Sequence, residues 1–323
     1  MAKRLYSIII PVYNRPDEID ELLESLTLQT YKNFEVIIVE DGSIEKCDNV
    51  VEKYVHELNI SYCYKENAGQ GFARNYGYER AKGEYFIVFD SDCIIPDNYF
   101  ETVESSLNQN YLDAYGGPDK AHDSFSPIQK AINFSMTSVL TTGGIRNKKK
   151  ALGGFSPKSF NMGISRTVFD ATGGYIIPFK GEDIEFSTRI RKMGFKTGLI
   201  EDAFVYHKRR ISWFKFFKQL HFFGTARINI ARFFPDQLKL VHFFPAFFTL
   251  GFILTILMWF FYPSIAKILT TTFAAYFFVL FIAALLSTRS LWISVLSIWA
   301  GFLQLTAYGT GLLQELLISL FKK

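Results

Sequence analysis

The stretch Tyr85–Asp92, YFIVFDSD, decides the fold, because five apolar residues run without interruption into two carboxylates. Such a run is typical of a strand buried on both faces of a parallel sheet. Phe34–Ser43, FEVIIVEDGS, has the same form, and Ser7–Val12, SIIIPV, is a third apolar run. Helically spaced apolar residues, among them Ile19 and Leu22, lie between these runs. The alternation predicts an α/β fold with a mostly parallel sheet and helices on both faces.

Polar residues gather where the predicted strands end, at Asn14, Asp41, Asp90 and Asp92. In open α/β sheets, ligands bind beyond the carboxyl ends of the strands. A lone acid such as Asp41 is commonly a helix cap, so the cap and ligand interpretations both stay open there. The acids Asp90 and Asp92, at i and i+2, favour a site for a hard divalent cation. Such a cation takes carboxylate oxygens as ligands and often binds phosphate oxygens at the same time. No GxGxxG follows the first strand, which argues against a dinucleotide-binding enzyme.

The C-terminal part of the chain differs from this charged body. The chain has 323 residues and a net charge of +4, yet Val241–Phe321 contains only three charged side chains, Lys267, Arg289 and Glu315. Residues 241–262, 268–288 and 291–321 are each long enough to span a bilayer, which takes about 20 apolar residues. We expect residues 241–323 to form an all-α transmembrane anchor of two to four spans. A buried hairpin in a soluble protein is a weaker alternative, because residues 1–240 could not cover three such helices.

Residues 207–240 join the two parts and are rich in basic and aromatic side chains. They hold eight Lys or Arg residues against one acid, Asp236. This composition predicts an interfacial amphipathic helix on anionic membrane lipids within residues 211–240. Single-strand nucleic-acid binding uses a similar mixture, but the adjacent span favours lipid, and no nucleic-acid partner is expected. Basic flanks stay inside, so we expect a multi-pass protein of the cytoplasmic (inner) membrane whose body faces the cytoplasm.

Two further features agree with a cytoplasmic body. The apolar run Ile8–Ile10 is too short for the core of a signal peptide. Cys47, Cys63 and Cys93 are odd in number and lack CxxC spacing, so neither a disulfide framework nor a zinc site is predicted.

The body resembles the family 2 glycosyltransferases, which are inverting enzymes with a GT-A fold. The likeness rests on five segments in order: SIIIPVYNRP, FEVIIVEDGS, GQGFARNYG, FIVFDSD and GEDIEFSTRIRKMGF. It covers residues 5–210 and implies a GT-A, Rossmann-like transferase domain over residues 1–210. It also implies a nucleotide-sugar donor, with a UDP-sugar as the first expectation, and Mg²⁺ or Mn²⁺ as cofactor.

The resemblance implies which residues bind the donor. Asp41 would accept hydrogen bonds from the base, and Pro11 and Tyr13 would line the pocket for base and ribose. Arg74 and Asn75 would lie beside the nucleotide. Arg74 could equally pair with an acid on a helix face.

The same likeness implies a metal site. Asp90 would face the ribose or the metal, and Asp92 would ligate the ion that bridges the diphosphate. His207 stands where the family often supplies a further ligand, although a lone histidine can equally be a packing residue. Negative charge builds on the departing diphosphate, so a divalent ion there stabilises the transition state as a Lewis acid.

The attacking hydroxyl must also lose a proton, and a carboxylate can accept it. By resemblance to the family's ED motif, Asp183 is the base and Glu182 orients the acceptor. The simpler interpretation is that both are first-turn acids favoured by the helix dipole. Asn161 and Met162 would lie in the strand beneath the acceptor and bind it.

The processive members of the family carry a QxxRW motif, but Gln219–Phe223, QLHFF, lacks the Arg-Trp pair. We therefore expect single addition of a sugar to a hydroxyl of a lipid-linked or cell-surface glycan in cell-envelope polysaccharide biosynthesis. The main alternative is a polyprenyl-phosphate sugar synthase, whose acceptor is the lipid phosphate. An inactive scaffold and a transporter are less favoured, given the acids above and the scarcity of charge in the spans. The basic loop at residues 145–150, IRNKKK, suggests a solvated charge run or a lid.

Overall fold

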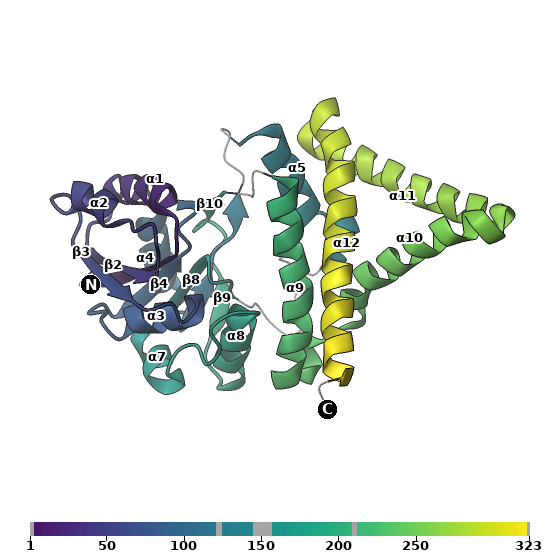
Figure 1. Ribbon diagram of the computed structural model, residues 1–323. Helices are drawn as coiled ribbons and strands as arrows, with labels where there is room; N and C mark the ends of the chain where they lie inside the picture. Colours follow the sequence, from purple (N-terminus) through teal and green to yellow (C-terminus); the bar gives the residue numbers. More distant parts are fainter. Residues whose placement is uncertain (1–2, 121–124, 145–156, 209–211, 322–323) are drawn as a thin grey trace. The chain divides into compact units, whose positions relative to one another are not determined.

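The computed structural model describes residues 3–120, 125–144, 157–208 and 212–321. The predicted loop at residues 145–150 lies outside these ranges. The chain divides into two compact units, and each is described by itself (Figure 1). The catalytic unit comprises residues 1–122 and 152–208, and the helical unit comprises residues 123–151 and 209–323.

The catalytic unit is built on a seven-stranded sheet of order β3-β2-β1-β4-β8-β6-β9. The strands are β1 (Tyr6–Val12), β2 (Phe34–Asp41), β3 (Ile60–Lys65), β4 (Tyr85–Phe89), β6 (Ala114–Gly116), β8 (Asn161–Ser165) and β9 (Thr197–Leu199). Only β8 runs antiparallel to its neighbours, β4 and β6. A second sheet has the order β5-β10-β7, with β5 (Cys93–Ile94), β7 (Asp119–Lys120) and β10 (Val205–His207). The predicted mostly parallel sheet is confirmed.

Helices connect these strands. They are α1 (Pro16–Thr27), α2 (Asp48–Val51), the 3-10 turn η1 (Glu52–Tyr54), α3 (Gln70–Tyr78), α4 (Tyr99–Gln109), α7 (Arg166–Thr172) and α8 (Glu182–Lys192). Successive side chains of a strand point to opposite faces, so an unbroken apolar run supplies two cores. Ile8 and Ile10 of β1 pack in the core that includes Leu22 of α1, whereas Ile9 packs in the core that includes Ala73 of α3. This two-sided burial explains why the strands show no polar alternation.

The helical unit contains α5 (Pro127–Thr137), α6 (Val139–Thr142), α9 (Trp213–Phe233), two 3-10 turns, η2 (Pro235–Gln237) and η3 (Leu240–Phe243), α10 (Phe244–Phe261), α11 (Pro263–Thr288) and α12 (Leu291–Phe321). Three segments are long and apolar enough to cross a membrane: Leu240–Phe261, Pro263–Thr288 and Leu291–Phe321. The predicted apolar C-terminal helices are therefore present.

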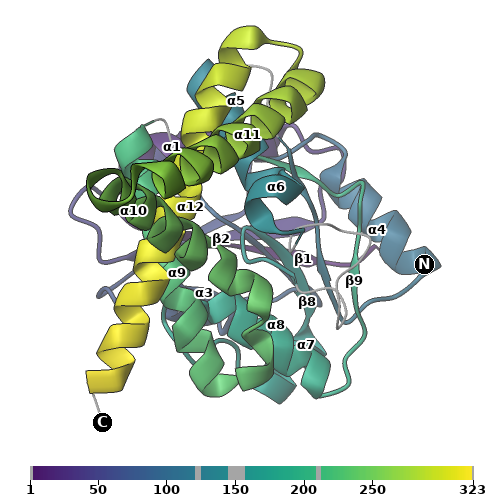
Figure 2. The same cartoon turned by 90° about the vertical axis from the view of Figure 1, so that its right-hand side faces the viewer.

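The helix α12 is the centre of the helical unit, with α5, α9, α10 and α11 packed on it. Both views show α9 beside α12 (Figures 1 and 2). Ile132 and Met136 of α5 join Phe216 of α9 and Ala300 of α12 in one apolar cluster. The predicted 1–210 domain includes α5, but this helix groups with the C-terminal helices because its apolar face packs there.

Candidate active site

The predicted site acids lie at one edge of the large sheet. β2 ends at Asp41, and β4 ends one residue before Asp90. Both strands run parallel to β1, which lies between them. Parallel neighbours end at the same edge, so both acids lie where open α/β sheets bind ligands.

The Asp41 carboxylate is held by its own chain. It accepts hydrogen bonds from Lys65 Nζ at 2.6 Å, Ala68 N at 3.0 Å and Gly69 N at 2.9 Å. Gly69 has a φ of +94°, a conformation that favours glycine. Asp41 therefore fixes the turn from which α3 begins.

Glu40 is a second carboxylate of this turn, and the sequence reasoning missed it. Its side chain is fully buried and accepts hydrogen bonds from Ser43 Oγ, from Cys47 N at 2.8 Å and from the Tyr62 hydroxyl at 3.1 Å. A buried charge requires such partners. The signal was an acid inside the apolar run of β2, next to the more conspicuous Asp41.

Arg74 joins a predicted donor-binding acid, Asp90, to a predicted catalytic acid, Glu182. Its guanidinium is fully buried, donates to Asp90 Oδ1 at 2.9 Å and to Glu182 Oε1 at 3.2 Å, and lies 5.4 Å from the ring centroid of Tyr175. Gln70 also donates to Glu182 Oε1. The end of β4 and the start of α8 are thus bound to one side chain of α3. The pairing with a helix acid, left open above, is the one observed.

The two acids that open α8 have different surroundings. Burial, and next the neighbouring Asp183 carboxylate, raise the pKa of Glu182 above its usual value, while Arg74 opposes the shift. The Asp183 side chain is one-fifth exposed, and Lys158 Nζ lies 3.5 Å from its Oδ2. Asp183 is therefore the accessible acid of the pair, whereas Glu182 is enclosed.

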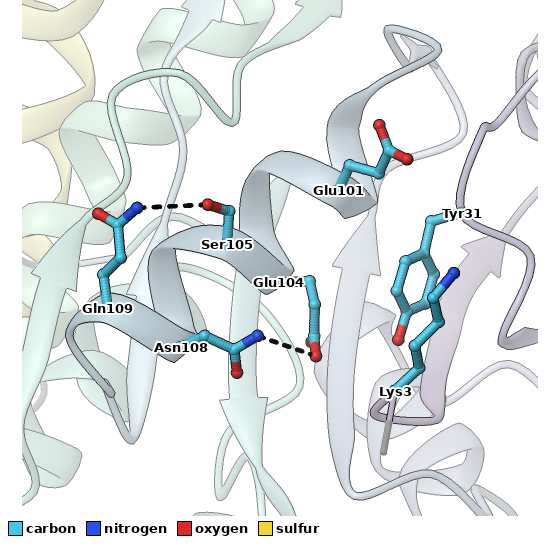
Figure 3. A pocket seen from close by; sticks show the side chains of 7 residues that line it. All are labelled: Lys3, Tyr31, Glu101, Glu104, Ser105, Asn108 and Gln109. Carbon is cyan, nitrogen blue, oxygen red and sulfur yellow. Dashed lines mark hydrogen bonds between the residues drawn. The ribbon is translucent and has the colours of Figure 1, made fainter. Parts of the chain in front are cut away.

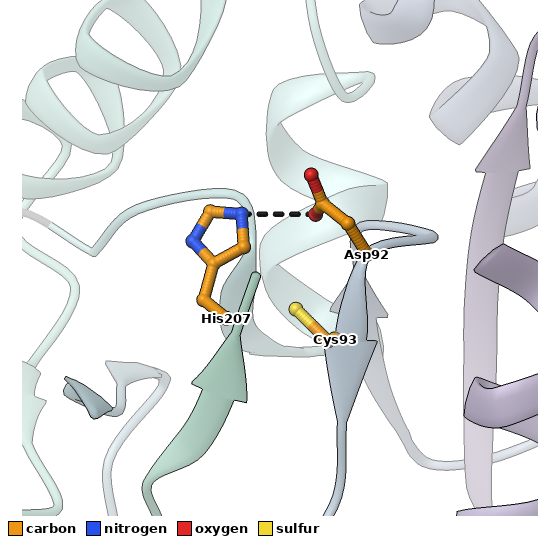
Figure 4. A group of neighbouring side chains, drawn as sticks. All are labelled: Asp92, Cys93 and His207. Atoms are coloured by element: carbon orange, nitrogen blue, oxygen red, sulfur yellow. Dashed lines mark ion pairs between the residues drawn. The ribbon is translucent and has the colours of Figure 1, made fainter. Parts of the chain in front are cut away.

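Asp92, Cys93 and His207 form a cluster whose potential ligand atoms lie within 4.8 Å of one another (Figure 4). Cys93 and His207 are register partners in the β5–β10 pair. His207 Nε2 lies 2.9 Å from Asp92 Oδ1, and Arg15 Nη1 lies 3.3 Å from Asp92 Oδ2. The fold thus brings together the two predicted metal ligands, although they are far apart in the sequence.

The donor chemistry of this cluster fits a divalent cation. Burial, and next the Asp92 and Asp90 carboxylates, raise the pKa of the Cys93 thiol well above its usual value, so this thiol is a poor ligand. A carboxylate and an imidazole remain, and both are ligands of divalent cations in proteins.

Three predicted donor-binding residues differ in accessibility. Tyr13 is 51% exposed and Pro11 is half-buried, so both can meet a ligand. Asn75 instead makes two hydrogen bonds of 2.8 Å with the backbone of Tyr175, one through Nδ2 and one through Oδ1. Its amide thus holds the loop before α8, and its role beside a nucleotide stays a prediction.

The predicted acceptor residues Asn161 and Met162 have fully buried side chains. Asn161 accepts a hydrogen bond from the Tyr99 hydroxyl at 2.5 Å and donates to the Ala203 carbonyl at 2.8 Å. The Met162 sulfur accepts from the Tyr175 hydroxyl at 3.8 Å. Direct contact of these two side chains with an acceptor is therefore corrected to a role inside β8, because both point into the core.

A shallow surface pocket of roughly 440 Å³ lies away from these acids, between α4 and the start of the chain (Figure 3). Its lining is Lys3, Tyr31, Glu101, Glu104, Ser105, Asn108 and Gln109. It contains none of the predicted site residues, so the strand-end acids remain the candidate site.

Curated relatives match part of the chain. An uncharacterized glycosyltransferase of Rickettsia typhi is 44% identical over 105 residues, which is 32% of this chain and 32% of that protein. Glycosyltransferase GlyG of Streptococcus pneumoniae is 33% identical over 115 residues, which is 35% of this chain and 38% of GlyG. The match thus spans about a third of each relative's length.

Solved structures share the fold. The mannosyltransferase PcManGT of Pyrobaculum calidifontis, in complex with GDP-Man and Mn²⁺, superposes with a TM-score of 0.62 at 18% identity over 100% of this chain and 89% of that one. TarS of S. aureus, in complex with UDP-GlcNAc, gives a TM-score of 0.50 at 22% identity over 69% and 66%. The family model "Glycosyl transferase family 2" matches residues 7–173, more than half of the chain. With the strand-end acids and this match, the chain belongs to glycosyl transferase family 2.

Proposed function

We propose that this chain is a membrane-anchored inverting glycosyltransferase that moves one sugar from a nucleotide-sugar donor to a hydroxyl of a lipid-linked or cell-surface glycan. The observation that carries the proposal is the buried Arg74, which ties Asp90 at the end of β4 to Glu182 at the start of α8. Donor-side and acceptor-side acids thereby belong to one rigid site. An inactive scaffold would have no need of this buried charge network, which is costly to desolvate.

The donor would bind at the strand-end edge beside Asp41. Pro11 and Tyr13 are accessible there for the base and ribose. The Asp41 carboxylate already accepts three N–H bonds, so about one of its four lone-pair sites remains for a base N–H. Two structures of similar fold hold GDP-Man and UDP-GlcNAc, and they support a nucleotide sugar without choosing the base.

A divalent cation, Mn²⁺ or Mg²⁺, would be held by Asp92 and His207. When bound, such an ion stabilises the charge that builds on the departing diphosphate. Arg15 Nη1, at 3.3 Å from Asp92 Oδ2, holds this carboxylate in place and adds positive charge on the same side. Asp90 would face the ribose or the ion with the carboxylate oxygen that Arg74 leaves free.

Asp183 would take the proton of the acceptor hydroxyl. It is the accessible acid of the pair, and Lys158 Nζ lies 3.5 Å from its Oδ2. Glu182 would position Asp183 through the Arg74 and Gln70 bonds rather than touch the acceptor. A lipid phosphate needs no proton removed at neutral pH. A general base at Asp183 therefore favours a hydroxyl acceptor over the lipid phosphate that a polyprenyl-phosphate sugar synthase would use.

The apolar helices support membrane association, and the basic segment before them supports a catalytic unit on the cytoplasmic face of the inner membrane. An enzyme tethered to the bilayer suits a lipid-linked acceptor, and membrane lipids are the expected partners of the helical unit.

The test measures binding of a panel of nucleotide sugars to the purified full chain with and without Mn²⁺, followed by transfer assays on Asp183→Asn. We expect one donor to bind in a Mn²⁺-dependent way, and Asp183→Asn to keep that binding while transfer falls by about 10²–10⁴-fold. Asp170→Asn, an exposed acid on α7, is the matched control and should retain transfer. Transfer by Asp183→Asn at the wild-type rate would refute the base assignment, and no binding of any donor would refute the function.

A further inference from the structure

The helices of the helical unit fall into two groups by charge. α10 has no charged residue, and α11 has only Lys267, which lies close to the turn that joins α10 and α11. α9 instead carries Lys215, Lys218, Arg227 and Arg232. α10 and α11 have a composition suited to hydrocarbon, and so by composition alone has α12, whose one charged residue is Glu315, whereas α9 does not.

The helix α12 runs parallel to the charged helix α9 and contacts it along its length. A Cβ on Gly311 would lie 2.1 Å from the His221 carbonyl oxygen, so the two backbones touch there. Further along, Arg232 Nη2 donates to Glu315 Oε1 at 2.9 Å and to Ser319 Oγ at 2.8 Å. Positions rise together on both helices, so α9 and α12 run parallel and side by side (Figures 1 and 2).

This pairing determines which helices can cross a membrane. At 1.5 Å per residue, the basic groups of α9 extend over about 26 Å from Lys215 to Arg232, close to the thickness of the hydrocarbon core. If α12 crossed the bilayer, α9 would cross with it and carry these cations through the interior. Lys215, Lys218 and Arg232 are exposed within the described residues, so the protein does not bury them. Exposed cations at that depth are strongly disfavoured.

The apolar composition of α12 has another explanation. Ala300, Leu305, Ala307 and Leu312 are fully buried against the other helices of the unit. A buried hydrogen bond of 2.8 Å joins Ser135 Oγ of α5 to Gln304 Oε1 in the middle of α12, so that face meets protein rather than lipid. Hydropathy alone cannot separate a helix covered by protein from one covered by lipid.

We propose that only the α10–α11 hairpin crosses the membrane, while α9 and α12 lie together along the headgroup layer on the side of the catalytic unit. The cations of α9 would meet anionic lipid headgroups, and Lys267 near the hairpin turn would reach the opposite headgroup layer. α10 has 18 residues, about 27 Å of helix, which is enough to cross. The proposal rests on the proposed membrane localisation, not on sugar transfer.

The distribution of basic residues agrees with two crossings. Arg289 lies between α11 and α12, and Lys322 and Lys323 follow α12 in the sequence. With two crossings, all three and the cations of α9 share one side of the membrane, as the positive-inside rule requires. With three crossings, the last two lysines would lie on the opposite side.

Single cysteines in the full chain test this topology. Lys215→Cys, Ser264→Cys at the hairpin turn and Leu320→Cys at the end of α12 all occupy exposed positions. Each variant is treated with a membrane-impermeant maleimide in intact cells and in inside-out vesicles. The native cysteines all lie in the catalytic unit, Cys47 and Cys93 buried, so the unsubstituted chain is the background control.

We expect Lys215→Cys and Leu320→Cys to be labelled from one side and Ser264→Cys only from the other. Labelling of Leu320→Cys from the same side as Ser264→Cys would establish three crossings and overturn the proposal. Labelling of all three from one side would show that the hairpin does not cross, and would also overturn it. Donor binding is measured separately, so a failed transferase assignment would leave this result unaffected.

Discussion

Replacing the buried Arg74 with methionine is the sharpest test of how the site is held together. The side chain is fully buried and binds two carboxylates, Asp90 at 2.9 Å and Glu182 at 3.2 Å. Asp90 is about one-third exposed, so water can solvate it after the change, but the Glu182 side chain is only 5% exposed. Removing one partner of a buried ion pair costs about 3–5 kcal/mol, because the other charge is left uncompensated.

For a unit of this size, such a loss lowers Tm by about 6–20 °C. The assay is thermal unfolding of the full chain in detergent for wild type, Arg74→Met, Glu182→Gln and the double variant. If the stranded Glu182 charge causes the loss, the double variant should be more stable than the sum of the single changes predicts, by about 1–3 kcal/mol. Arg80→Met is the control, because Arg80 pairs at the surface with Glu79 at 3.6 Å and such pairs contribute about 0–1 kcal/mol.

The loss should also depend on pH. The pKa of Glu182 is already raised in the folded protein, and removing Arg74 raises it further. A folded carboxyl with a raised pKa makes stability fall as pH rises from the ordinary Glu pKa of about 4.3 towards the folded value. The deficit of Arg74→Met should therefore shrink as pH is lowered through that interval. Strictly additive single changes with no pH dependence would refute the argument.

Three further predictions concern other parts of the chain. Asp92→Ala should abolish the Mn²⁺ dependence of donor binding measured by calorimetry, and binding that is indifferent to EDTA in the wild type would contradict a metal site. Gly117→Ala should prevent folding of the catalytic unit, because its Cβ would lie 1.8 Å from the Ala203 carbonyl oxygen; a wild-type Tm would contradict this. Gly311→Ala should lower the Tm of the helical unit, because its Cβ would meet the His221 carbonyl at 2.1 Å, and a variant with unchanged stability would show that α9 and α12 are not in contact there.

The sheet and its site edge could be predicted because they depend on local pattern. An apolar run that is long enough for a strand and ends in acids specifies both the strand and the edge where its acids lie, as for Asp90 and Asp92. The sequence left two alternatives for Arg74, a place beside the nucleotide or an ion pair with a helix acid. Sequence spacing does not show which acid a buried arginine binds. Glu40 was missed although it is an acid inside the apolar run of β2, because the local pattern does not show which buried donors would enclose its carboxylate.

Other features depend on long-range packing. The family resemblance implies that Asn161 and Met162 bind the acceptor, but β8 lies between β4 and β6, and their side chains are enclosed. The amphipathic pattern of α5 shows that it has an apolar face but not which partner covers that face. For α12, composition predicts a membrane span. Its packing against the charged helix α9 is what favours the headgroup layer over the hydrocarbon core, and composition does not show that packing.

The division of the chain has a consequence for dissection of the protein. Because residues 123–151 belong to the helical unit, the chain passes between the two units at three points, near residues 122, 151 and 208. The transferase portion therefore cannot be produced as one N-terminal fragment. A fragment that stops before α9 would retain α5 with Ile132 and Met136 stripped of their partners, and we expect it to aggregate. A soluble enzyme requires two cuts and a new linker in place of residues 123–151. By the same reasoning, deletion of the C-terminal helices alone would remove the anchor but leave the apolar face of α5 uncovered.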